Sequence, residues 1–322
     1  MRPSLRLLAL LMSTPLAARA APAQSADPAD PGSRFTWESF AGEGGARRYR
    51  LYVPASHRRS RPAPLLVMLH GCTQDPDDFA RGTRMNALAE EHGFLVAYPE
   101  QTAAHNPQRC WSWYDPAHQE RGRGEPAAIA GIARQVVAAC GVDPRRVYLA
   151  GVSAGGAMAL NVAAAYPELF AAAGVHSGVA YRAAAGVPQA LQVMQRGSAD
   201  SVSLAGSAGA ALRARGAPLP LLVIHGAADP VVRLINGEQL VRQWTGGLAA
   251  AAERRAEEGG LTTVRRGWNT GDGRAVVEEI VVEGLGHAWS GGSPEGTYTD
   301  PRGPDASREM VRFFLARARE ER

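Results

Sequence analysis

One short segment of the chain has the composition of a catalytic turn. Residues 151–155 read Gly-Val-Ser-Ala-Gly, directly after the apolar run 147–150 and directly before the alanine-rich run 154–165. A sharp turn between a strand and a helix exposes the serine hydroxyl above the end of a sheet, and the two glycines let neighbouring backbone approach closely. The segment therefore predicts Ser153 as a nucleophile for acyl transfer.

The histidine that could activate this serine is identified by its place in the chain. A serine hydroxyl is a weak nucleophile by itself, so the chemistry requires a histidine base, an acid that orients the base, and donors for an oxyanion. Where a G-x-S-x-G turn follows a strand, the chain order is serine, acid, histidine. Of the eight histidines, only His287 lies beyond residue 225, in a glycine turn after the predicted strand 276–282. We predict His287 as the base and interpret His176 and His225 as structural.

The best candidate for the acid is Asp229. It lies in the segment HGAADPV, which directly follows the apolar run 219–224. Asp200 and Asp272 lie in glycine-rich or serine-rich turn sequence, where an aspartate more often caps a turn than takes part in catalysis. The sequence therefore predicts Asp229 as the residue that orients the base.

Two backbone amides are candidates for binding the oxyanion. The first is the amide of Ala154, which directly follows the nucleophile. The second lies in residues 70–74, which read HGCTQ after the apolar run 65–69. In this architecture the second donor comes from the turn after the third strand, so we expect Cys72 to supply it.

The elements that must position these residues alternate between short aliphatic runs and alanine-rich helical runs. This alternation is typical of an α/β fold, a mostly parallel sheet with helices on both faces, and we predict one domain over residues 35–322. The predicted strands cover residues 49–53, 65–69, 94–98, 147–150, 171–175, 219–224 and 276–282. The predicted helices cover residues 126–140, 154–165, 234–251 and 307–319, and residues 183–215 are expected to be partly helical over the top of the sheet.

The composition excludes several other chemistries. All 35 Lys+Arg positions are arginine, so the chain has no lysine. A Schiff-base nucleophile, a phosphate-binding loop ending in Lys-Ser/Thr and a Ser-Lys dyad are therefore excluded. The formal net charge is +4, without a basic tail or stripe, so a nucleic-acid partner is not expected. The predicted chemistry requires no cofactor and no metal ion, and the oligomeric state is unknown at this stage.

The N-terminal segment predicts export. Residues 1–20 contain Arg2 and Arg6, then an apolar run and a final Ala-Arg-Ala, which is typical of a signal peptide cleaved after Ala20. Residues 21–34 are rich in Pro, Ala, Ser and Asp and are expected to form a disordered leader. The apolar run is shorter than the roughly 20 residues that a membrane span needs. We therefore expect a secreted protein, extracellular or periplasmic, with no membrane anchor.

Three cysteines, Cys72, Cys110 and Cys140, predict one disulfide and one remaining thiol in an oxidising compartment. The sequence alone allows three pairings. We favour Cys72 with Cys110, because this bridge would fix the turn that carries the predicted oxyanion donor. The wide spacing of the cysteines argues against a structural zinc site.

Taken together, these motifs resemble those of the poly(3-hydroxybutyrate) depolymerase family of secreted α/β-hydrolases, which is related to feruloyl and acetylxylan esterases. The resemblance covers residues 47–318. The motifs that carry it are HGCTQ at 70–74, CWSWY at 110–114, GVSAGG at 151–156, HGAAD at 225–229, GHAWSGG at 286–292 and GPD at 303–305. It implies an α/β-hydrolase fold with Ser153 as nucleophile, Asp229 as orienting acid, His287 as base, and Cys72 and Ala154 as oxyanion donors.

The chain departs from the family pattern in two ways. Ala227 stands where the family often has a second aspartate, which removes a rival for the role of Asp229. Many extracellular members also carry a linker and a separate polymer-binding domain, which we do not expect in residues 35–322. Soluble oligomers, amorphous polymer or a small ester are therefore more suitable substrates than dense granules.

Three tryptophans lie beside the motifs in the sequence. Trp111, Trp113 and Trp289 could form an apolar groove for polyester units, or stack on a hydroxycinnamoyl ring. Ordinary core positions are the alternative for all three.

We therefore expect a secreted serine esterase that hydrolyses short-chain polyhydroxyalkanoate, as 3-hydroxybutyrate oligomers or amorphous polymer, through a Ser-His-Asp triad and an acyl-enzyme. The main alternative is a feruloyl or acetylxylan esterase acting on plant cell-wall esters. Further alternatives are a peptidase or acyltransferase on the same scaffold and a catalytically silent binding protein. An ester substrate is the partner that the sequence implies.

Overall fold

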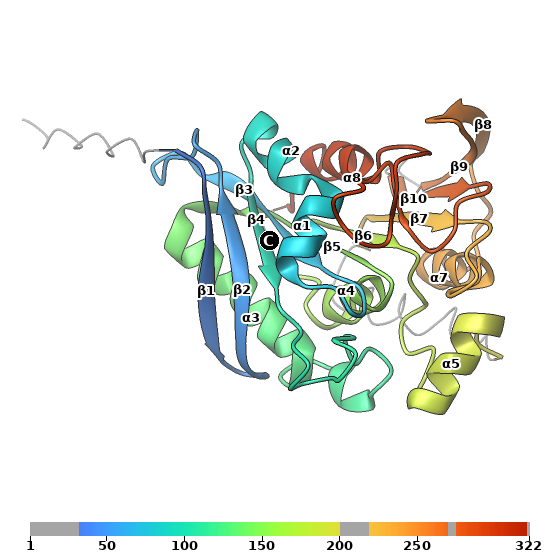
Figure 1. Ribbon diagram of the computed structural model, residues 1–322, viewed down its shortest axis with the longest axis horizontal. Helices are drawn as coiled ribbons and strands as arrows, with labels where there is room; N and C mark the ends of the chain where they lie inside the picture. The colour runs from blue at the N-terminus through green and yellow to red at the C-terminus, as the bar shows by residue number, and fades with distance from the viewer. Residues whose placement is uncertain (1–31, 200–218, 270–274, 321–322) are drawn as a thin grey trace, which may run out of the picture.

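The computed structural model describes residues 32–199, 219–269 and 275–320. In these residues ten strands form one sheet, in the order β1-β2-β4-β3-β5-β6-β7-β10-β9-β8 (Figure 1). The six strands from β4 to β10 in this order run parallel, and antiparallel pairs extend the sheet at both ends. The strands are β1 Arg34–Gly42, β2 Gly45–Val53, β3 Ala63–Leu69, β4 Leu95–Pro99, β5 Val142–Val152, β6 Ala172–His176, β7 Leu221–Gly226, β8 Ala252–Glu258, β9 Leu261–Asn269 and β10 Ala275–Val282. A separate short pair consists of β11 Trp289–Ser290 and β12 Thr299–Asp300.

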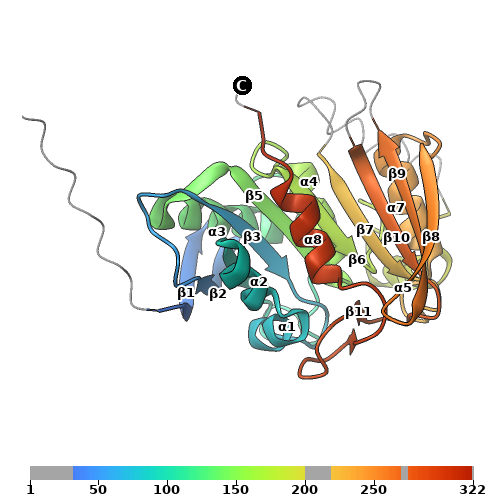
Figure 2. The same cartoon turned by 90° about the horizontal axis from the view of Figure 1, so that it is seen from above.

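Helices cover both faces of the sheet (Figure 2). They are α1 Pro76–Thr83, α2 Met85–His92, the short 3-10 helix η1 Pro116–His118, α3 Gly124–Cys140, α4 Ala154–Ala165, α5 Val187–Arg196, α7 Ile235–Thr245 and α8 Ala306–Leu315. Alternate residues of β3 point to opposite cores: Leu65 and Val67 pack with α3 and α4, whereas Leu66 and Met68 pack with α1, α2 and α8. Every residue of β3 is buried, which explains its continuous apolar sequence. The predicted fold class is confirmed.

In the ten-stranded sheet, the strands that the sequence did not predict lie towards its two ends. All seven predicted strands are present, within a few residues of their expected bounds, but β1, β8 and β9 were missed, as was the short pair β11 and β12. β8 reads AERRAEE and is mostly exposed, because its antiparallel pairing with β9 requires no buried face. Apolar periodicity is the signal for a buried strand, and a solvated edge strand does not produce it.

The helix predicted over residues 234–251 is too long. α7 ends at Thr245 because Gly246 adopts a left-handed conformation and donates its amide to the carbonyl oxygen of Arg242. α8 also ends earlier than expected, at Leu315. The helix predicted over residues 154–165 has the same bounds in the structure.

Some predictions fall outside the described residues. The signal peptide and most of the leader are among them, as are Asp200 and Asp272. β1 begins at Arg34, so the predicted leader extended one residue too far. α5 is helical as expected in the described part of residues 183–215. The described part of the chain contains no helix that is long and apolar enough to span a bilayer.

Candidate active site

Five neighbouring parallel strands end at the same edge of the sheet, and each leads to a residue of chemical interest. The strands are adjacent in the order β3, β5, β6, β7 and β10. In that order they lead to His70, Ser153, His176, Asp229 and His287. Ligands of open α/β sheets bind at the carboxyl ends of the strands. The topology therefore gathers these five residues where a substrate would bind.

Ser153 occupies the tight turn between β5 and α4. Its backbone has φ 55° and ψ −122°, which is unfavourable for a residue with a side chain. A Cβ atom on Gly155 would lie 2.2 Å from the carbonyl oxygen of Leu69, and a Cβ atom on Gly151 would lie 2.4 Å from the backbone of Gly155. A larger residue at either position would force α4 away from the sheet. The glycines of the G-x-S-x-G pattern are therefore required by close backbone approach.

His287 connects Ser153 to Asp229 through two hydrogen bonds. Its Nε2 lies 2.9 Å from Oγ of Ser153, and its Nδ1 lies 2.7 Å from Oδ2 of Asp229. An ionised carboxylate only accepts hydrogen bonds, so Nδ1 carries the ring proton and Nε2 remains an acceptor for the serine hydroxyl. This arrangement suits a general base beside a nucleophile.

The carboxylate of Asp229 is buried, and its two oxygen atoms have different partners. Oδ1 accepts hydrogen bonds from the amides of Val231 at 2.9 Å and Val232 at 2.8 Å, whereas Oδ2 accepts the bond from His287. Burial raises the pKa of Asp229, but His287 and the two amides outweigh burial and hold the pKa below its usual value. His225 donates from Nε2 to the carbonyl oxygen of Val232 at 2.8 Å, which agrees with a structural role.

The turn after β3 lies against the serine. A Cβ atom on Gly71 would be 3.6 Å from Cβ of Ser153. Neither the amide of Cys72 nor that of Ala154 has a hydrogen-bond acceptor in the described part of the chain. Ala154 is also the first residue of α4, where the helix dipole favours negative charge. Both amides are therefore open to an oxyanion at this edge of the sheet.

A disulfide joins Cys72 and Cys110, as predicted. The amide of Thr73 adds a hydrogen bond of 2.7 Å to the carbonyl oxygen of Gln108. The turn with the predicted oxyanion donor is thus tied to the segment after β4 by a covalent bond and a hydrogen bond. Cys140 is the remaining thiol. Burial raises its pKa, so a smaller fraction of it is in the reactive thiolate form.

His70 supports the same turn from inside the protein. Its Nδ1 donates to the carbonyl oxygen of Gly71 at 2.7 Å, and its Nε2 accepts from the amide of Gln101 at 3.1 Å. These bonds fix one neutral tautomer, because a proton on Nε2 would point at the N–H of Gln101. Burial lowers the pKa of His70 to about 4, so the ring stays neutral at physiological pH.

We expect the protein to lose stability as the pH falls from 6.5 towards 4. Burial lowers the pKa of His70 to about 4 and that of His176 to about 3, whereas an unfolded histidine has a pKa near 6.5. The unfolded chain therefore binds protons that the folded chain does not, which lowers the free energy of unfolding by roughly 1–3 kcal/mol per histidine.

Urea denaturation at pH 7.5, 6 and 5 measures this loss. Replacing the partly exposed His92 with glutamine is the control for the loss of an imidazole outside the core. A free energy of unfolding that stays constant over this range would contradict the expectation.

The three tryptophans predicted to contact substrate are buried instead. Trp111 is exposed by 0%, Trp289 by 1% and Trp113 by 6%. Trp289 stacks on His176, with ring centroids 5.1 Å apart, and donates Nε1 to Oγ of Ser307 at 3.1 Å. The structure therefore does not place these rings in a substrate groove. They fill the core below the edge of the sheet, where large aromatic rings stabilise most strongly.

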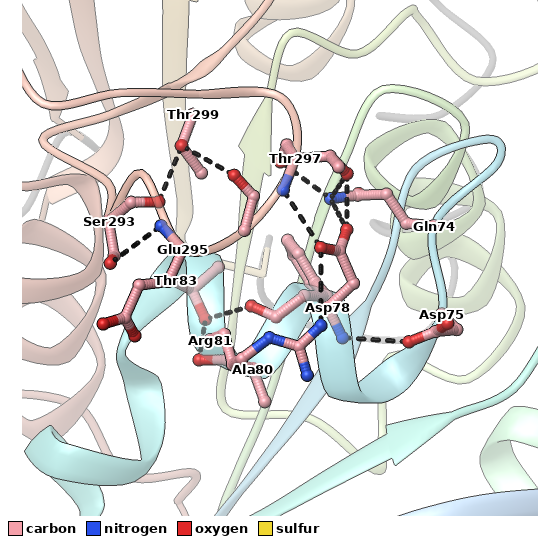
Figure 3. A network of polar contacts seen from close by, with 12 residues as sticks. Gln74, Asp75, Asp78, Ala80, Arg81, Thr83, Ser293, Glu295, Thr297 and Thr299 are labelled. Carbon is pink, nitrogen blue, oxygen red and sulfur yellow. Dashed lines mark hydrogen bonds and ion pairs between the residues drawn. The ribbon is translucent and has the colours of Figure 1, made fainter.

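A polar network that was not predicted joins α1 to the loop after His287. The carboxylate of Asp78 accepts bonds from Nε2 of Gln74 at 3.1 Å and from the amide of Thr297 at 3.0 Å (Figure 3). Oε1 of Gln74 accepts from the amide of Gly71 at 2.9 Å. The network connects the turn after β3 to the segment that follows the predicted base. The sequence did not indicate this network, because contacts between distant segments leave no local pattern.

The parallel sheet, the strained serine turn and the bonded series Ser153, His287 and Asp229 define the chain as an α/β-hydrolase. A comparison of sequences identifies the family to which it belongs within this class. The sequence model of the family described as Esterase PHB depolymerase matches residues 47–263, and the chain belongs to that family. The resemblance noted from the motifs is confirmed, and the family is one of carboxylic ester hydrolases.

Similar curated proteins are named as depolymerases and esterases. Poly(3-hydroxyalkanoate) depolymerase C of Paucimonas lemoignei is 32% identical over 243 residues, which cover 74% of this chain and 56% of the relative. Feruloyl esterase B of Thermothelomyces thermophilus is 28% identical and is matched over 74% of this chain and 83% of its own length. Acetylxylan esterase A of Emericella nidulans is 29% identical, with 74% and 79% covered. This chain thus spans little more than half of the depolymerase.

A solved structure shows the same fold. The acetyl xylan esterase from Aspergillus awamori superimposes with a TM-score of 0.65 and 23% sequence identity. The match covers 78% of this chain and 94% of that chain. At this identity the likeness shows a shared fold and does not identify the substrate.

Proposed function

We propose that the chain is a serine esterase with Ser153, His287 and Asp229 as its catalytic residues. The observation that carries the proposal is the pair of hydrogen bonds, 2.9 and 2.7 Å long, that connects the Ser153 hydroxyl through His287 to a buried carboxylate. Membership of an esterase family supports the same reading.

The proposed reaction has two halves. Oγ of Ser153 attacks the ester carbonyl carbon while its proton moves to Nε2 of His287, and the amides of Cys72 and Ala154 bind the oxyanion. The imidazolium formed on His287 is stabilised by Asp229 and returns the proton to the leaving alcohol. A water molecule then attacks the acyl-enzyme while His287 takes its proton, and His287 returns that proton to Oγ of Ser153 as the acid is released.

We propose a short-chain polyhydroxyalkanoate as the substrate, in the form of 3-hydroxybutyrate oligomers or amorphous polymer. The match to a poly(3-hydroxyalkanoate) depolymerase supports this choice. The matches to feruloyl and acetylxylan esterases support the alternative of a plant cell-wall ester. We also propose that the protein is exported, which the disulfide between Cys72 and Cys110 supports, since such bonds persist in oxidising compartments.

A comparison of substrates tests the proposal. The purified full chain is assayed on 3-hydroxybutyrate oligomers, methyl ferulate and acetylated xylan, and a fluorophosphonate probe is mapped to its site of attachment by mass spectrometry. We expect the probe on Ser153 and the highest kcat/KM on the oligomers. A higher kcat/KM on methyl ferulate or on acetylated xylan would contradict the proposed substrate and favour a plant cell-wall ester. The absence of all ester hydrolysis, together with an unlabelled Ser153, would favour a silent binding protein.

A further inference from the structure

Tyr298 contacts two segments of the candidate site, the one that follows the proposed base and the turn that carries the proposed oxyanion donor Cys72. Its carbonyl oxygen accepts a hydrogen bond of 2.7 Å from the amide of Trp289, which follows His287 closely in the chain. Its hydroxyl lies 3.0 Å from Oγ1 of Thr73, the residue directly after Cys72. Tyr298 therefore contacts the segment of the base through its backbone and the oxyanion turn through its side chain.

The loop that carries Tyr298 is fixed on α1. The neighbouring Thr297 donates its amide to the carboxylate of Asp78 at 3.0 Å, as Figure 3 shows. A Cβ atom on Gly296 would lie 2.4 Å from Cα of Gly82, so the backbone of the loop packs directly on the backbone of the helix. Because the loop is packed in this way, the side chain of Tyr298 is held in a defined position where it can contact a ligand.

Both residues in this contact have a strained backbone. Thr73 has φ 65° and Tyr298 has φ 52°, the left-handed region that β-branched and bulky residues rarely adopt. Ser153, with φ 55°, is another such residue at the same edge of the sheet. Strained residues persist where their surroundings hold them, and they concentrate at ligand sites.

The protons in this contact can be assigned. Oγ1 of Thr73 donates its single proton to the carbonyl oxygen of Cys72 at 2.6 Å, so it accepts from the Tyr298 hydroxyl. The oxygen of Tyr298 then keeps its capacity to accept, and it receives no hydrogen bond from the part of the chain that the structure describes. Tyr298 is 49% exposed, so a ligand can reach both the oxygen and the ring.

We propose that Tyr298 determines specificity by accepting a hydrogen bond from a hydroxyl group on the acyl chain of the substrate. The enzyme would thereby favour acyl groups with a free hydroxyl, such as the hydroxyl-terminal unit of a 3-hydroxybutyrate oligomer, because the hydroxyl of an internal unit is esterified and has no proton to donate. The Tyr298 hydroxyl contacts Thr73, the residue directly after the proposed oxyanion donor Cys72, and a 3-hydroxyl is separated from the ester carbonyl carbon by only two carbon atoms. The exposed tyrosine ring provides an apolar contact for those carbon atoms. The inference rests on the esterase function proposed above.

Two substrates that differ by one hydroxyl group test the inference. The measurement is the ratio of kcat/KM for p-nitrophenyl 3-hydroxybutyrate to that for p-nitrophenyl butyrate. Tyr298→Phe keeps the ring and removes the acceptor, so the ratio should fall by about 3- to 10-fold, the effect of one hydrogen bond. Because both substrates are measured on one preparation, the ratio does not depend on the fraction of enzyme that is folded.

Thr73→Ala is the matched control. It removes the same hydrogen bond between the two side chains but leaves the Tyr298 oxygen in place, so the ratio should stay within about twofold of the parent. An unchanged ratio in Tyr298→Phe, or an equal fall in Thr73→Ala, would overturn the inference and assign the contact to support of the turn. If the parent hydrolyses neither ester, the esterase function itself fails, which is a different result.

Discussion

Ser153→Ala is expected to lower kcat/KM for a short-chain p-nitrophenyl ester by about ten-thousand-fold or more. Without the hydroxyl, His287 has no oxygen to deprotonate, and only substrate binding and the oxyanion amides of Cys72 and Ala154 remain. Those contributions alone give a far smaller acceleration than the complete set. Alanine retains Cβ and the backbone, so the turn at φ 55° keeps its shape and the protein should remain folded.

Ser177→Ala is the matched control for this substitution. Ser177 lies directly after β6, beside β5, and has a similar φ of 51°. Its Oγ lies 3.1 Å from Nδ1 of His176 and makes no hydrogen bond to Ser153, Asp229 or His287 in the described part of the chain. We expect a change in kcat/KM of less than about tenfold for this control. If Ser153→Ala also stays within tenfold of the parent, with an unchanged circular dichroism spectrum, Ser153 is not the nucleophile.

Asp229→Asn is expected to lower kcat by about a thousand- to ten-thousand-fold with little effect on folding. The side-chain oxygen of asparagine can still accept the amides of Val231 and Val232, which hold the loop after β7. Its NH₂ group would face Nδ1 of His287, favour the tautomer with the proton on Nε2, and so remove the acceptor for the proton of Ser153.

Asp305→Asn provides the comparison for Asp229→Asn. Asp305 caps α8, with Oδ1 accepting the amide of Arg308 at 3.0 Å, and asparagine caps helices about as well. Its kcat and melting temperature should both stay close to those of the parent. The assignment of Asp229 would be wrong if Asp229→Asn retained its kcat, or if it lost activity only because it unfolds, as thermal melts would reveal.

The placement of the three proposed catalytic residues could be predicted because each follows a buried apolar strand. A parallel strand buried on both faces is a continuous apolar run, and the residue after it lies at the carboxyl edge of the sheet. The runs before Ser153 and Asp229 are therefore visible in the sequence, and the run before His287 is interrupted only by Glu278 and Glu279. Such strands are therefore easier to predict from the sequence than any other element.

Other features could not be predicted because they depend on contacts between distant segments. Thr73 and Tyr298 are separated by 225 positions in the chain, and nothing in the HGCTQ motif around Thr73 indicates a contact with Tyr298. The burial of the three tryptophans could not be predicted for a related reason. An indole ring near a catalytic motif suits a core position as well as a substrate site, and only packing, such as Trp289 on His176, distinguishes the two.

The position of the site on the sheet has a consequence for refolding. The proposed catalytic residues and oxyanion turn follow β3, β5, β7 and β10, and Tyr298 lies on the loop before β12. The strands β3, β5, β7 and β10 pair in parallel with neighbours that are far away in the chain. Such pairings form slowly, because the intervening loops must close before the contacts stabilise them, whereas helices form from local contacts. Recovery of ester turnover after dilution from denaturant therefore comes late and reports the fraction of molecules in which the whole parallel sheet is complete.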